Sequence, residues 1–100
     1  MSLFKVNDAN RVLFLRNKLR EIKKGKDESM QTYFLRIIEI KNDLLSIGET
    51  IIDREMALTT LGGLPSEWYM FRTTLLNNNV IPGFEELMAR GIQEETGVEE

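Results

Sequence analysis

The sequence predicts an all-α fold, a compact bundle of five short helices. Apolar residues recur at steps of three and four along most of the chain, which is the spacing of one helix face. No stretch alternates apolar and polar residues as a half-buried strand does, and Val80-Ile81 is too short to count as one. The breaks between the periodic segments fall at Gly25, Gly48, Gly62-Gly63, Asn77-Asn78-Asn79 and Pro82-Gly83.

The first two predicted helices carry the longest apolar stripes. We expect the first over residues 9–24, capped by Asn7 or Asp8, and the second over residues 29–47, ended by Gly48. The stripes are Val12, Leu15, Leu19 and Ile22, then Met30, Tyr33, Ile37, Ile40, Leu44 and Ile47. A second row of Phe34, Ile38 and Leu45 broadens the apolar face of the second helix. This helix should therefore lie at the centre of the bundle or be half covered by a partner.

Three shorter helices follow. The third is expected over residues 53–62, with Ala57, Leu58 and Leu61 turned inward and Met56, Thr59 and Thr60 pointing elsewhere. The fourth begins at Pro65, buries Trp68, Phe71 and Leu75, and leaves Tyr69 and Met70 exposed. The last covers residues 84–95, with Phe84, Leu87, Met88 and Ile92 on one side. The predicted organisation is an N-terminal extension of residues 1–7, a helical domain of residues 8–95 and a frayed tail of residues 96–100.

Composition excludes several kinds of chemistry. The 100 residues are 42% hydrophobic and 29% charged, as in one small folded domain, and they include no Cys and no His. Structural zinc of the Cys/His type, disulfides, and Ser-His or Cys-His nucleophiles are therefore excluded. The acidic pairs Glu85-Glu86 and Glu94-Glu95 project to different sides of a helix and predict solvated faces. We expect no enzymatic activity, no cofactor, no membrane-spanning segment and a cytoplasmic protein.

The charge is unevenly distributed. Residues 1–26 hold eight basic and two acidic residues, whereas the remainder holds five basic and fourteen acidic ones. A solvated basic face is the favoured interpretation of the first helix, and contact with an anion or nucleic acid is a second. A third is head-to-tail attraction between the basic start of one copy and the acidic end of another.

The turn between the first two helices carries the most informative residues. Gly25 is expected to end the first helix through a positive φ angle, and Asp27, Glu28 and Ser29 offer caps to the second. Arg36 lies about two helical turns after Glu28 and is close enough to fold back toward the turn. The spacing predicts an ion pair that fixes the direction of the chain.

Gly25, Glu28, Tyr33 and Arg36 resemble the major homology region of retroviral and retrotransposon Gag capsids, with Lys24 where that pattern usually has Gln. The segments Leu61-Gly62-Gly63-Leu64-Pro65 and 84–95 are similar to copia-type Gag, so the resemblance covers about residues 8 to 95. It implies a capsid C-terminal domain similar in layout to the five-helix C-terminal lobe of the neuronal protein Arc.

The resemblance also implies roles for residues. Gly25, Glu28, Tyr33 and Arg36 would form a structural network in which Glu28 and Arg36 clamp the turn. Self-association would use the surface of the third helix, at Met56, Thr59 and Thr60 with Arg54 and Glu55 at its rim. Lys23, Lys24 and Lys26 form a hypothetical contact with a polyanion inside an assembled lattice.

The expected function is that of a structural Gag domain that dimerises and assembles into a shell. Its partners would be further copies of itself and an upstream capsid N-terminal domain, with RNA bound only weakly or indirectly. The alternative is a domesticated Gag lobe that acts as an adaptor for peptides of cellular proteins. Capture of a partner peptide without assembly would distinguish the adaptor, and steep salt-dependent retention on RNA would indicate nucleic-acid binding.

Overall fold

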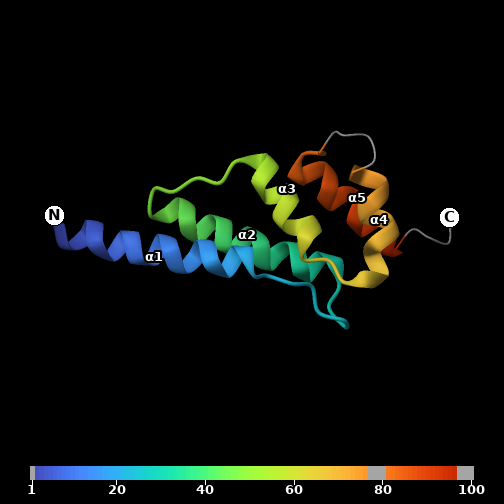
Figure 1. The fold of residues 1–100 in the computed structure, drawn as a ribbon, viewed down its shortest axis with the longest axis horizontal. Coiled ribbons are helices and arrows are strands. Elements are labelled where there is room, and N and C mark those ends of the chain that lie inside the picture. The colour runs from blue at the N-terminus through green and yellow to red at the C-terminus, as the bar shows by residue number, and fades with distance from the viewer. Residues whose placement is uncertain (1, 77–80, 97–100) are drawn as a thin grey trace.

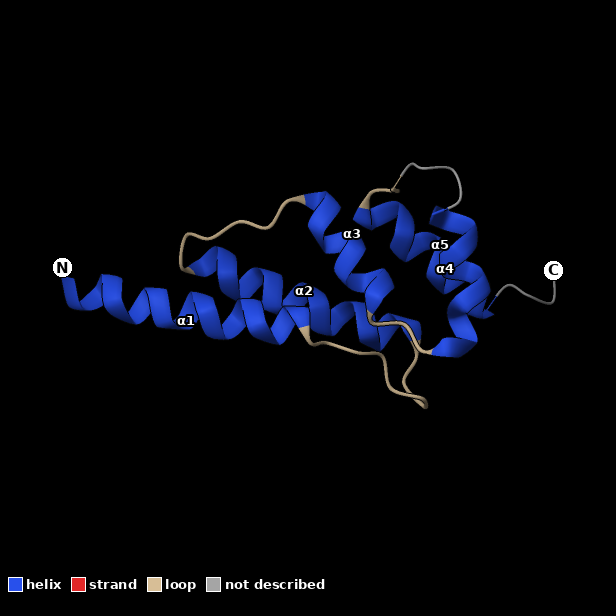
Figure 2. Cartoon of the chain, in the orientation of Figure 1, coloured by secondary structure: helices blue, strands red, loops and turns tan. Residues whose placement is uncertain are grey.

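The computed structural model describes the backbone of residues 2–76 and 81–96, and the side chains of the same ranges from residue 9 onward. In these ranges the chain forms helices and connecting segments, without a strand (Figures 1 and 2). The elements are α1 (Ser2–Arg20), α2 (Met30–Ser46), α3 (Asp53–Gly62), a single 3₁₀ turn η1 (Ser66–Trp68), α4 (Tyr69–Leu76) and α5 (Phe84–Thr96). The predicted all-α bundle of five helices is confirmed.

The second helix is the centre of the molecule. It runs antiparallel to α1 on one side, while α3, α4 and α5 gather around the end at which it begins (Figure 1). Met30, Tyr33, Ile37 and Leu44 are completely buried along it, as the broad apolar face predicted. Leu15 and Leu19 of α1 and Phe84 and Leu87 of α5 complete the core around this stripe.

The first helix makes the molecule elongated. Its N-terminal part extends past the end of α2 (Figure 1), and the radius of gyration is 15.2 Å. A domain of this length that is roughly spherical has a radius of gyration of about 13 Å. Leu13 and Phe14 on the outer face of α1 are 60% and 62% exposed.

The bounds of the first helix differ from the prediction of residues 9–24. Asn7 and Asp8 lie inside α1 rather than at its start, because Asn or Asp within a helix costs less than about 0.7 kcal/mol relative to Ala. The helix ends at Arg20, and the next residues leave it so that the Lys24 amide can donate to the Gly63 carbonyl at 2.9 Å. The division at residue 8 remains a prediction; the predicted break at residues 77–79 and most of the predicted tail lie outside the described residues.

The inward face of α3 was predicted wrongly by one position. Met56 and Thr60 are buried beside Ala57 and Leu61, whereas Leu58 is 43% exposed. The reason is that the Thr60 hydroxyl donates to the Met56 carbonyl of its own helix, at 2.8 Å. A threonine satisfied in this way can occupy a core position that a polarity pattern assigns to solvent.

The glycine that requires a positive φ is Gly48 rather than Gly25. Gly48 has a φ of 87° and is the positive-φ glycine among the described residues. It ends α2, as predicted, and its amide donates to the Leu45 carbonyl at 2.9 Å. Because Gly25 does not adopt this conformation, its freedom of φ is not what turns the chain.

Gly63 lies where the end of α3 contacts the α1–α2 corner, and its carbonyl accepts from the Lys24 amide. A Cβ atom at Gly63 would collide with the Tyr33 hydroxyl and with the Ile22 carbonyl. The φ of Gly63 is −93°, which any residue adopts, so the requirement for glycine is one of space alone. The neighbouring Gly62 has open space where its Cβ would lie.

We therefore expect Gly63→Ala to lower the free energy of unfolding by about 2 kcal/mol or more, because backbone and the Tyr33 ring must move apart. Gly62→Ala is the matched control and should stay within about 1 kcal/mol of the wild type. Urea denaturation followed by circular dichroism measures both. Equal stability of the two variants would contradict this account of Gly63.

Candidate functional site

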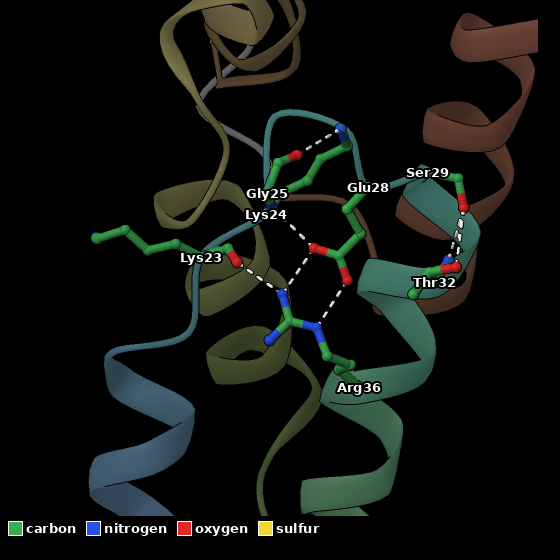
Figure 3. Close-up of polar contacts among 7 residues, drawn as sticks. All are labelled: Lys23, Lys24, Gly25, Glu28, Ser29, Thr32 and Arg36. Carbon is green, nitrogen blue, oxygen red and sulfur yellow. Dashed lines mark hydrogen bonds and ion pairs between the residues drawn. The ribbon is translucent and has the colours of Figure 1, made fainter.

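A clamp of charge-assisted hydrogen bonds closes the turn between α1 and α2 (Figure 3). Arg36 of α2 donates from Nε and Nη2 to the two carboxylate oxygens of Glu28, both at 2.7 Å. Its Nη2 also donates to the Lys23 carbonyl at 2.7 Å. Gly25 completes the clamp, because its amide donates to Glu28 Oε1 at 2.8 Å. The predicted ion pair is present, with two backbone groups of the turn held by the same two side chains.

The electrostatics of the clamp stabilise the charged forms of both partners. The Arg36 guanidinium lowers the pKa of the Glu28 carboxyl, against the effect of partial burial. The hydrogen bond from Glu28 raises the pKa of Arg36 in turn. The Glu28 side chain is 13% exposed and that of Arg36 is 43% exposed, so the pair lies at the protein surface with its carboxylate covered.

Tyr33 belongs to a different contact from the clamp. Its hydroxyl donates to the Thr60 carbonyl at 2.8 Å, and burial raises the pKa of the phenol above its ordinary value. The Arg36 guanidinium carbon lies 6.0 Å from the centre of the Tyr33 ring. The four residues predicted as one network therefore link the turn to α2 through Arg36 and α2 to α3 through Tyr33.

Lys24 is buried, with 7% of its surface exposed, so its predicted contact with a polyanion is wrong in this conformation. Its Nζ lies 3.4 Å from the Gly25 carbonyl and 5.8 Å from the centre of the Trp68 ring. A cation over an aromatic face can be buried at lower cost than an isolated charge. Lys23 and Lys26 are exposed, and for them the polyanion contact remains a prediction.

The N-terminus of α2 has a local cap, in which Ser29 accepts from the Thr32 amide at 3.1 Å, as the capping pattern predicted. In addition, the N-termini of α2 and α5 are each capped by a carboxylate that is distant in sequence. Glu95 at the end of α5 accepts from the Met30 amide at 3.0 Å, and Asp53 of α3 accepts from the Phe84 amide at 3.1 Å. The sequence predicted neither long-range cap, because only the tertiary fold brings Glu95 and Asp53 to these amides.

The predicted self-association surface is only partly exposed. Met56 and Thr60 are buried in the core and cannot contact a partner, which corrects their predicted role. Arg54 and Glu55 are exposed and Thr59 is half-buried. Glu55 lies 3.7 Å from Arg16 of α1. The residue that the prediction missed is Leu58, which is the apolar side chain exposed on this face of α3.

Within the part of the chain that the structure describes, no group of three or more acidic side chains is placed to hold a metal ion. No helix in those ranges is both long and apolar enough to cross a bilayer.

The clamp predicts how stability depends on pH. Because the pKa of Glu28 is lowered in the folded protein, its stabilisation is complete above the unfolded value near 4.5 and is lost as the pH falls through the folded value. We expect Glu28→Gln to lose roughly 1 kcal/mol at neutral pH and to show a shallower decline below pH 4.5.

Glu86→Gln is the control, because Glu86 pairs with Arg90 at 3.0 Å with both side chains more than half exposed. Its effect should be about 0.5 kcal/mol or less. Thermal unfolding at a series of pH values measures the three proteins. A Glu28→Gln variant with the full acid dependence of the wild type would argue against the clamp as its source.

The comparison with protein families agrees with the predicted resemblance to copia-type Gag. The family described as gag-polypeptide of LTR copia-type matches residues 1–100. No curated protein and no solved structure gives a significant match. The match extends over all 100 residues, and the chain belongs to the copia-type LTR gag-polypeptide family.

Proposed function

We propose that this chain is the C-terminal capsid domain of a copia-type Gag and that it works by self-association within a shell. The observation that carries the proposal is the clamp of Glu28 and Arg36, found in a chain of the copia-type Gag family. The clamp ties the turn between α1 and α2 to α2, and it engages both carboxylate oxygens of Glu28 and the Nε and Nη2 groups of Arg36 in hydrogen bonds within the chain. Its geometry therefore supports a structural role, and the family is structural rather than enzymatic.

We place the two-fold contact on the exposed face of α3. Leu58, 43% exposed, is its apolar centre, and Arg54, Glu55 and Thr59 surround it. One self-complementary patch suffices for a two-fold dimer, and Arg54 takes part in no ion pair among the described residues. Met56 and Thr60 support this surface from inside the core.

The wider assembly adds an upstream capsid N-terminal domain and further copies of the chain. RNA contributes weakly or indirectly, because the whole chain carries a net charge of −3 and the buried Lys24 is withdrawn from the surface. A cytoplasmic location is the expectation for such an assembly.

Leu58→Asp should weaken dimerisation at least about tenfold, because two carboxylates would meet at the centre of a two-fold contact. Leu35→Asp is the matched control, since Leu35 is 56% exposed on α2 and lies outside the α3 face. Sedimentation equilibrium measures the isolated domain, and electron microscopy of a longer chain with its upstream domain shows whether closed particles form.

Melting temperatures of both variants show whether they fold. If Leu58→Asp folds, dimerises as the wild type does and still supports closed particles, the α3 contact is refuted. Absence of any ordered particle from the longer wild-type chain would refute the shell function itself.

A further inference from the structure

A groove with more acidic than basic lining residues lies along α4, between α5 and the turn that precedes α2, and its basic lining residues are Lys24, Lys26 and Arg90. Two adjoining cavities of about 560 and 610 Å³ share Met70, Phe71 and Glu94. Trp68 and Glu67 line the larger cavity. Met70, which lines both cavities, is 73% exposed. Such a surface suits an elongated partner that carries both apolar and basic side chains. We call it the α4–α5 groove.

The acidic groups of this groove are not equally available. Glu28 is held by Arg36, and Glu95 accepts from the Met30 amide, so both are occupied inside the chain. Asp27, Glu67 and Glu94 are exposed and take part in no ion pair among the described residues. Asp27 directly follows the exposed Lys26, so Glu67 and Glu94 are the two carboxylates best placed to meet cations of a partner without disturbing the fold.

The outer face of α1 has the opposite chemistry. Arg11, Phe14 and Lys18 are spaced by three and four residues, so they share one helix face, and all three are exposed. The Lys18 amine lies 5.9 Å from the centre of the Phe14 ring. Leu13 extends the apolar area beside Phe14. The other face of α1, with Leu15 and Leu19, is buried in the core, so the outer face is free.

We propose that the α4–α5 groove binds the outer face of α1 from a second copy of this chain. Phe14 and Leu13 would cover Met70 and Phe71, while Arg11 and Lys18 would meet Glu67 and Glu94. The choice of a second copy follows from this double match of apolar and charged groups, both present on one chain. The inference rests on the proposed function, self-association, and names a contact separate from the α3 face.

The geometry makes this contact heterologous. The donor residues lie in the second half of α1, and the groove lies on α4 and α5, so the two surfaces belong to different elements of the molecule (Figure 1). A donor surface and an acceptor surface on different parts of one chain generate rings or open rows rather than closed pairs. The contact therefore adds lateral connections between the two-fold dimers that the α3 face would form.

A mixing experiment with two charge-reversal variants tests the proposal. Arg11→Glu/Lys18→Glu removes the donor surface and keeps the groove, whereas Glu67→Lys/Glu94→Lys removes the groove and keeps the donor. Both are made with Leu58→Asp, so that any dimer through α3 is suppressed. Sedimentation velocity up to about 1 mM protein, at low salt, detects even a weak contact.

With the Leu58→Asp chain alone, we expect species larger than a dimer as the concentration rises. Each charge-reversal variant alone should associate at least about tenfold more weakly. An equimolar mixture should associate more strongly than either variant alone and regain species larger than a dimer, because the intact donor meets the intact groove and the two reversed surfaces are again opposite in charge. Glu85→Lys, the same change at an exposed site on α5 that lines neither cavity of the groove, should leave association unchanged.

Several results would overturn the inference. One is a mixture that stays monomeric, and another is a pair of variants that associate as strongly as the Leu58→Asp chain. A Leu58→Asp chain that is monomeric at about 1 mM also contradicts it. That last result leaves the proposed function intact if the wild-type chain still dimerises through α3. Conversely, head-to-tail growth can be observed while Leu58→Asp leaves the association of the chain unchanged. That result would refute only the two-fold contact through α3.

Discussion

The hydrogen bonds of one guanidinium group determine the geometry of the α1–α2 corner. Arg36 is anchored in α2, and it holds both the Lys23 carbonyl before the turn and the Glu28 carboxylate after it. The segment between the helices is therefore tied to α2 at both of its ends. With the corner fixed, the Lys24 amide reaches the Gly63 carbonyl and the Tyr33 hydroxyl reaches the Thr60 carbonyl. These two contacts tie the end of α3 to the α1–α2 corner.

The architecture was predictable because the periodic apolar spacing of α1, α2 and α5 is set by burial on one face. The sequence also predicted the pairing of Glu28 with Arg36, since their spacing matches about two helical turns. The sequence did not predict which face of α3 is buried. Thr60 has a polar side chain and is nevertheless buried, because its hydroxyl donates a hydrogen bond to a carbonyl of its own helix. The placement of Lys24 over Trp68 and of Glu95 at Met30 depends on contacts between segments distant in sequence, which local patterns do not contain.

The residues that hold the corner together and the exposed apolar residues lie in different parts of the structure. Gly25, Glu28, Tyr33 and Arg36 are used internally, either in the clamp or in the contact with Thr60. The side chains left for partners lie elsewhere: Leu58 on α3, Met70 on α4, and Leu13 and Phe14 on α1. The clamp residues are thus separate in the structure from the exposed apolar side chains on which the proposed contacts rest.

The long-range caps have a consequence for the order in which the fold can close. The contact of Arg36 with Glu28 spans 8 residues of sequence, whereas that of Glu95 with Met30 spans 65. The entropy of loop closure makes the shorter loop favourable by about 2 kcal/mol relative to the longer one. The corner can therefore form while most of the chain is still unfolded. The start of α2 receives its second cap only after α5 has docked, so the same turn takes part in both an early and a late step of folding.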